Sequence, residues 1–201
     1  MLIEHEGKRP RVHETAYVAS TAVVCGDVTI GPRSHVAFGA VVAAEGAPVV
    51  IGADCMIREN AVVKGSPGHG VSIGDAVLVG PHASVVGCTV DDEVFIATGV
   101  AIFPGARLGR GVEVRINGVV QVNTILEAGT TVPIGWIAVG NPAQSFPPDE
   151  HEHIWGIQKP LNFPKTMYGV DRAADGSVDM RAIMRTIAQR YDAHRSDRII
   201  D

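Results

Sequence analysis

An aliphatic residue recurs at every sixth position through most of this chain, and that period restricts the possible folds more than any other feature of the sequence. The period is interrupted three times, by steps of nine, ten and five residues. A small or β-branched residue lies four places after most of the aliphatic ones, and glycine often follows them directly. The aliphatic positions are Val12, Val18, Val24, Ile30, Val36, Val42, Ile51, Ile57, Val63, Ile73, Val79, Val85, Val90, Ile96, Ile102, Leu108, Val114, Val120, Leu126, Val132 and Ala138.

This period is the hexapeptide pattern of a left-handed parallel β-helix. In such a solenoid each unit is one short strand and a corner, three units make one coil of a triangular prism, and both recurring side chains point inward. Glycine and asparagine at the corners supply positive φ angles that other residues resist. The sequence therefore predicts an all-β solenoid over residues 12–143, after an N-terminal lead-in of residues 1–11 and before a C-terminal helical tail of residues 144–201.

The two longer interruptions predict loops, because extra residues must leave the prism. They fall at residues 43–50 (AAEGAPVV) and 64–72 (KGSPGHGVS), one coil apart. Loops that leave a solenoid often form its binding face. We therefore look for a site beside these two loops.

The tail is expected to contain helices. Two prolines break the repeat after Phe146, and an acidic first helical turn follows them. Ser177 is positioned to cap a last helix with one apolar stripe. We expect this stripe to pack along the prism of its own or of a neighbouring subunit; its members are Met180, Ile183, Met184, Ile187 and Tyr191.

Composition argues against several classes of protein. The formal charge is −5, whereas a nucleic-acid binder normally carries a basic face. The three cysteines are dispersed and form no CxxC pair, which favours a reducing compartment. The charged first residues do not suit a signal peptide, and no apolar run is long enough to span a membrane. We expect a cytoplasmic protein that contacts neither nucleic acid nor membrane.

Several stretches resemble the γ-class carbonic anhydrase-like proteins of the hexapeptide-repeat superfamily. The resemblance runs from about Val12 to Ala143, and the two loops, the five-residue step and the helical tail fall where that family has them. The stretches that carry it are GAVVAA at 39–44, IGADCMIRENAVV at 51–63, IGDAVLVG at 73–80, VVGCTV at 85–90 and VGNPA at 139–143.

The metal site of that family is not preserved. In the family three histidines bind a zinc-type metal, one just before the second loop and two in a Gly-His-x4-His run. Lys64, Pro81 and Val86 stand at these three places here. Proline and valine offer no ligand atom, and a lysine ammonium must first lose its proton. A catalytic metal needs three protein ligands and an open position, so we do not expect efficient CO2 hydration.

Other polar residues surround the same place. The resemblance implies a site between subunits around Arg58, Glu59, Lys64, His69 and His82, where a small molecule is bound or transformed. One hypothesis is a rebuilt zinc-type metal site that uses His69, His82 and a carboxylate, with a ligand from a neighbouring subunit. The competing interpretation makes His82 a corner residue and His69 a solvated loop tip.

A second hypothesis is a CoA-dependent acyltransferase, because many hexapeptide proteins are acetyltransferases. His69 or His82 would then be the general base. The late-coil arginines Arg107, Arg110 and Arg115 would meet the phosphates of acetyl-CoA.

A third hypothesis is a non-catalytic binding or scaffold protein, in which Arg58, Glu59 and Lys64 form a polar seam between subunits. Hexapeptide prisms usually assemble as trimers, so the fold implies a homotrimer. The remaining histidines are expected at the surface; they are His5, His13, His35, His151, His153 and His194.

Overall fold

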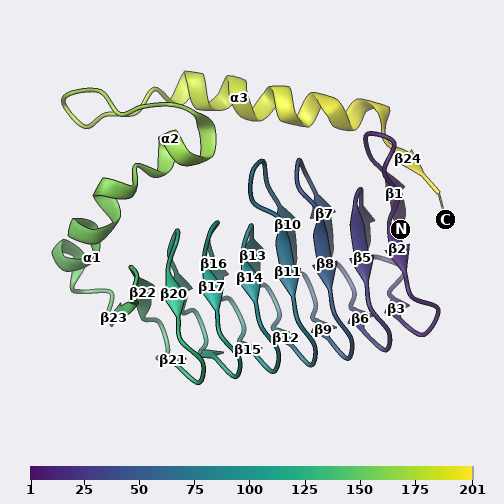
Figure 1. The fold of residues 1–201 in the computed structure, drawn as a ribbon. Coiled ribbons are helices and arrows are strands. Elements are labelled where there is room, and N and C mark those ends of the chain that lie inside the picture. The colour runs from purple at the N-terminus through teal and green to yellow at the C-terminus, as the bar shows by residue number, and fades with distance from the viewer. Residues whose placement is uncertain (201) are drawn as a thin grey trace.

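The computed structural model describes residues 1–200 and confirms the solenoid (Figure 1). The chain winds into a left-handed parallel β-helix of about eight turns, followed by short C-terminal helices. Three sheets form the sides of the prism, and each strand pairs with the strand one coil later, so that β4, β7 and β10 are neighbours. We call the three sides sheets A, B and C.

Each sheet collects every third strand along the solenoid. Sheet A contains β1 (Leu2–Glu4), β4 (Val23–Cys25), β7 (Val41–Ala44), β10 (Val62–Gly65), β13 (Ser84–Val86), β16 (Ala101–Ile102), β19 (Val119–Val120), β22 (Ile137–Val139), β23 (Gln144–Phe146) and β24 (Arg198–Ile199). Sheet B contains β2 (Arg11–Val12), β5 (Val28–Ile30), β8 (Val49–Ile51), β11 (Val71–Ile73), β14 (Thr89–Val90), β17 (Arg107–Leu108) and β20 (Ile125–Leu126). Sheet C contains β3 (Tyr17–Val18), β6 (His35–Val36), β9 (Met56–Ile57), β12 (Leu78–Val79), β15 (Phe95–Ile96), β18 (Glu113–Val114) and β21 (Thr131–Val132).

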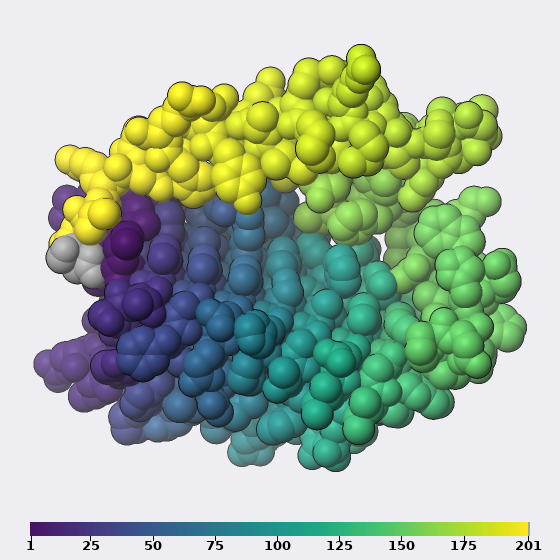
Figure 2. All heavy atoms as spheres, turned by 180° about the vertical axis from the view of Figure 1, so that it is seen from behind, coloured from purple at the N-terminus to yellow at the C-terminus, as the bar shows by residue number. Residues whose placement is uncertain are grey.

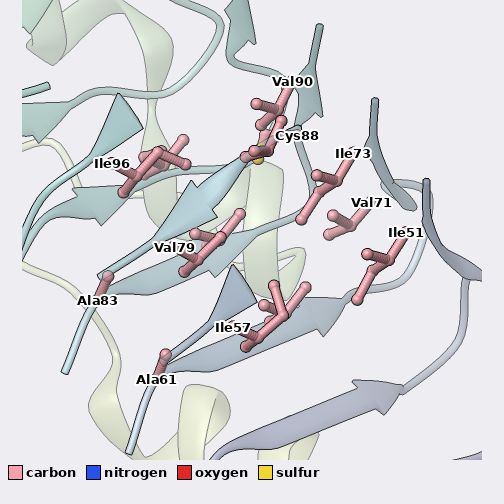
Figure 3. Close-up of a cluster of buried hydrophobic side chains, with 14 of the residues drawn as sticks. Ile51, Ile57, Ala61, Val71, Ile73, Val79, Ala83, Cys88, Val90 and Ile96 are labelled. Carbon is pink, nitrogen blue, oxygen red and sulfur yellow. The ribbon is translucent and has the colours of Figure 1, made fainter. Parts of the chain in front are cut away.

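The core is a set of aliphatic stacks that run along the prism. Every aliphatic position of the hexapeptide series from Val24 to Ala138 is buried, as predicted. In sheet B, Ile30 is in register with Ile51, and Ile51 with Ile73. Figure 3 shows Ile51 and Ile73 pointing into the same interior as Ile57 and Val79 of sheet C. Each side chain is thus packed by its equivalents in the coils before and after it.

A ladder of glycines marks the corner between sheets B and C. A Cβ atom on Gly31 would lie 2.5 Å from the carbonyl oxygen of Gly52, and one on Gly52 would lie 2.6 Å from that of Gly74. Neither contact is sterically possible. The coils can approach this closely at the corner only because glycine has no Cβ atom.

Replacing Gly31 with alanine is expected to lower the free energy of unfolding by about 1–3 kcal/mol, the usual cost of overpacking. The methyl group meets backbone, which cannot rotate away. Gly156→Ala is the matched control, because Gly156 lies in a helix with nothing within 4 Å of the added atom. Alanine there favours the helix by about 0.8–1 kcal/mol. Urea unfolding of both variants measures the difference, and equal midpoints would contradict the prediction.

Both ends of sheet A are closed by antiparallel strands. At one end β23 pairs with β22, and at the other β24 pairs with β1. Residues 1–11, expected as a lead-in, begin with β1, which pairs in parallel with β4 and forms a side of the first coil. The two antiparallel strands thus pair the outer edges of the first and last coils on this side of the prism.

The tail returns along the outside of the solenoid (Figure 1). It contains α1 (His151–Gln158), the 3₁₀ turn η1 (Lys159–Leu161), α2 (Phe163–Tyr168), α3 (Met180–Asp192) and the 3₁₀ turn η2 (Ala193–Ser196). Figure 2 shows α3 lying across the N-terminal coils.

The expected last helix is present, but its details differ from the sequence prediction. Asp179 caps it instead of Ser177, because the Asp179 side chain accepts a hydrogen bond from the Ala182 N–H. Of the predicted apolar stripe, Ile183 is buried whereas Met180 and Met184 are half exposed. The helix therefore covers the prism along a narrower stripe than the pattern predicted.

Candidate functional site

The two loops leave the solenoid at the same corner, between sheets A and B, and lie directly against each other. The Glu45 N–H donates to the carbonyl of Gly65, and a Cβ atom on Gly46 would meet Pro67 at 3.0 Å. In the second loop Ser66 and His69 exchange two backbone hydrogen bonds and form a tight turn. Both loops rise toward α3 (Figure 1), so the predicted binding corner faces the helical tail.

Lys64 and Val86, which stand at two of the family's metal-ligand positions, are register partners on the adjacent strands β10 and β13. Lys64 Nζ lies 2.6 Å from Glu45 Oε2, and both side chains are largely buried. At this ligand position of the family the chain therefore has the Lys64 ammonium group, and the Glu45 carboxylate balances its charge. Val86 has no ligand atom, so this pair does not fit a zinc ion.

The third family position, Pro81, lies at the other end of β13. It lies in the turn before the strand, whereas Val86 is the last residue of the strand, so the two positions lie at different corners of the prism. One chain therefore cannot bring the three positions together. Only a neighbouring subunit could complete a site of this kind.

The two candidate histidines also lie at different corners of the prism. His69 packs beside Gly87, where an added Cβ atom would meet the His69 Cβ at 2.8 Å. His82 is exposed at the opposite corner with φ of 59°, and its N–H donates to the carbonyl of Glu59. The corner position suggested for His82 is found, while a metal site that uses both histidines stays a prediction that needs two subunits.

Arg58 and Glu59 lie at the His82 end of the coil and pair with each other at 3.0 Å. The backbone N–H of Glu59 and the Arg58 guanidinium lower the pKa of the Glu59 carboxyl. Arg58 also lines an open groove of about 380 Å³ with Pro81, Phe95 and Ile134. This groove is distinct from the corner that holds Lys64.

The three arginines suggested for CoA lie on different parts of the prism. Arg107 is on sheet B, Arg110 is at the corner that follows it, and Arg115 follows a strand of sheet C. Arg110 and Arg115 already pair with Glu93 and Glu113. The structure does not gather them into one phosphate site, and the CoA hypothesis stays a prediction without support from this cluster.

A small pocket encloses Lys64, and half of its wall comes from the tail. Its volume is about 220 Å³, and the tail residues that line it are Met167, Tyr168, Ile187, Arg190 and Tyr191. The Lys64 ammonium lies 5.4 Å from the centre of the Tyr191 ring. The apolar stripe of the last helix predicted Ile187 and Tyr191 against the prism, but nothing in the repeat indicated that they would cover Lys64.

Ser66 lines this pocket with a buried hydroxyl group that can donate a hydrogen bond. It is 5 % exposed, and its hydroxyl has no hydrogen-bond partner among residues 1–200. A buried hydroxyl without a partner is costly. It is therefore a candidate contact for a ligand.

The three cysteines, Cys25, Cys55 and Cys88, are free and buried. Burial raises the pKa of the Cys88 thiol to about 12, which keeps it protonated and unreactive.

Within residues 1–200 there is no helix that is both long and apolar enough to span a membrane.

Comparisons with known proteins agree with the fold and the resemblance. The mitochondrial gamma carbonic anhydrase 1 of Arabidopsis thaliana is 36% identical over 143 residues, which are 68% of this chain and 50% of that protein. A carbonic anhydrase of Geobacillus kaustophilus is 31% identical over 111 residues, or 55% of this chain and 61% of that protein. The chain spans about half the length of the first curated relatives that it matches.

A hexapeptide transferase family protein from Anaplasma phagocytophilum has the same fold, with a TM-score of 0.52 and 22% identity over 93% of this chain and 96% of that one. No protein-family model matches the sequence. The repeat, the solenoid and the curated relatives agree with the resemblance: over about two thirds of its length the chain is similar to γ-class carbonic anhydrases, and it folds as a hexapeptide-repeat solenoid.

Proposed function

We propose that this protein binds a small anion in the pocket beside Lys64 and does not hydrate CO2. The observation that carries the proposal is the Lys64–Glu45 ion pair, because it fills the place of the family's metal with a lysine. A metal-bound hydroxide needs three ligand side chains around one metal. Lys64 and Val86 do not supply them, and Pro81 is distant.

The charges of the pocket favour a monoanion. Lys64 and Arg190 contribute two positive charges and Glu45 one negative charge, so one positive charge is left over. The Ser66 hydroxyl adds a buried donor. The volume of about 220 Å³ suits a ligand of a few heavy atoms, such as a small carboxylate or bicarbonate.

We further propose that the chain forms a homotrimer in which a second copy covers the groove beside Arg58. The groove is lined by apolar residues of sheet C and its edges, and Phe95, Ile116 and Ile134 expose between 42% and 68% of their surface. Large apolar side chains in one groove favour a protein partner over solvent. Such an assembly would set the Pro81 corner of one subunit beside its neighbour.

The three reduced cysteines support a cytoplasmic location.

Two alternatives are less well supported by the geometry. The acyltransferase hypothesis lacks a gathered set of arginines for CoA. A purely structural role would leave the Ser66 hydroxyl buried without a partner. Lys64, Arg190 and the Ser66 hydroxyl favour anion binding instead.

Lys64→Met is expected to weaken anion binding about 10- to 100-fold, because a hydrogen bond to a charged group contributes about 1.5–3 kcal/mol. Titration calorimetry with sodium formate, acetate and bicarbonate measures the affinity. Lys8→Met is the matched control, since Lys8 pairs with Asp27 on the surface. Equal affinities of the two variants, or no saturable binding of any of the three salts to the native protein, would refute the proposal.

A further inference from the structure

A cluster of possible metal ligands lies where the tail returns to the first coil. The strand β24 pairs with β1, with Ile199 opposite Ile3, and η2 packs beside it. Figure 1 shows this junction, at which the two ends of the described chain meet. The four side chains come from β4, from η2 and from positions just after β1 and just before β24: Cys25, His194, His5 and Asp197.

The ligand atoms of these side chains already converge. Asp197 Oδ1 lies 2.6 Å from His5 Nδ1, and Asp197 Oδ2 lies 2.7 Å from His194 Nδ1. Cys25 Sγ lies 3.9 Å from Asp197 Oδ2, and all four ligand atoms lie within 4.8 Å of one another. Tetrahedral ligands bound at about 2.0–2.3 Å are roughly 3.3–3.8 Å apart. Small side-chain movements would therefore suffice to surround an ion.

The second ring nitrogen of each histidine faces a carboxylate, beyond hydrogen-bond distance. His194 Nε2 faces Glu45 Oε1 at 3.8 Å, and His5 Nε2 faces Glu6 Oε2 at 3.9 Å. Each imidazole thus turns one nitrogen to the centre of the cluster and the other toward a carboxylate. His5 is only 5 % exposed, although the sequence placed it at the surface.

The surroundings of Cys25 favour a cation. Cys25 is buried, and its Sγ faces the Asp197 carboxylate at 3.9 Å. Metals bind the thiolate, so a cation at the centre would displace the thiol proton. Two imidazoles, a thiolate and a carboxylate form a donor set that suits Zn²⁺.

We propose that His5, Cys25, His194 and Asp197 form a structural zinc-class metal site that fastens the tail to the first coil. The site is separate from the ligand positions of the carbonic anhydrase family, which Lys64, Pro81 and Val86 occupy. It also touches the anion pocket, because Glu45 lies between His194 and Lys64. A metal ion here would hold α3 in place over that pocket.

The test is metal titration of the whole chain after dialysis against a chelator and a reductant. Co²⁺ is expected to bind at one equivalent per chain and to give a thiolate-to-cobalt charge-transfer band, and Zn²⁺ is expected to displace it. Cys25→Ser is expected to abolish the band, and His194→Ala is expected to lower the affinity at least 100-fold. Circular dichroism shows whether each variant is folded.

Two control variants separate this site from others. Cys55→Ser keeps its contacts to backbone carbonyls and is expected to keep the band. His69→Ala, at the loop near Lys64, is expected to bind Co²⁺ normally. The proposal is overturned if the reduced native chain binds neither metal, if folded Cys25→Ser and His194→Ala bind as the native chain does, or if His69→Ala removes the metal. None of these outcomes depends on anion binding, so the two proposals fail independently.

Discussion

Truncation of Ile51 to alanine is expected to lower the free energy of unfolding by about 2–5 kcal/mol, the range for large-to-small changes in a packed core. Ile51 is 1% exposed and is stacked between Ile30 and Ile73. The cavity cannot close easily, because the spacing of the coils is fixed by the backbone ladders on all three sides. Urea unfolding followed by circular dichroism measures the change.

The preceding residue supplies the matched control. Val50 lies on the same strand but points outward and is 44% exposed. Val50→Ala is therefore expected to change the free energy of unfolding by about 0.5 kcal/mol or less. If both truncations cost the same, the alternation of inward and outward side chains on which the solenoid depends would be wrong.

Histidine at the three family positions is expected to create a zinc site beside the two loops. The change is Lys64→His, Pro81→His and Val86→His together. Positions 64 and 86 are register partners, so two imidazoles would lie side by side, and the third would come from a neighbouring subunit. Three imidazoles are a sufficient protein ligand set for Zn²⁺.

The experiment measures zinc by elemental mass spectrometry and mass by light scattering. It uses a Cys25→Ser background, so that any zinc at the proposed tail site does not contribute. About one zinc per chain is expected, and only in the trimer. A double variant that keeps Pro81 is the control, because two ligands hold zinc far more weakly than three. Zinc in a monomer, or a zinc-free trimer, would contradict the proposed arrangement between subunits.

The fold could be predicted from the sequence because nearly every hexapeptide repeats the same pattern of residue types. The aliphatic residue, the small residue and the corner glycine recur together, and their agreement leaves little freedom for another fold. The strand β1 could not be found in this way. Leu2 and Ile3 precede the repeat, and they are ordered by backbone pairing to β4 and β24, which leaves no period in the sequence.

The candidate site was only partly predictable. The resemblance placed Lys64 and Val86 together, and the register of β10 and β13 confirms that they are neighbours. It could not indicate that α3 would cover them, since no spacing in the chain relates Tyr191 to Lys64. The cluster around Asp197 is harder still, because its members are far apart in sequence and meet only when the tail folds back.

The meeting of β24 with β1 also has a consequence for biosynthesis. A solenoid can add coils one after another as the nascent chain leaves the ribosome, since each coil contacts only its neighbours. The first coil is the exception, because its outer edge is completed by Arg198 and Ile199. The outer edge of β1 therefore stays unpaired while the coils that follow it are made, until Arg198 and Ile199 have left the ribosome.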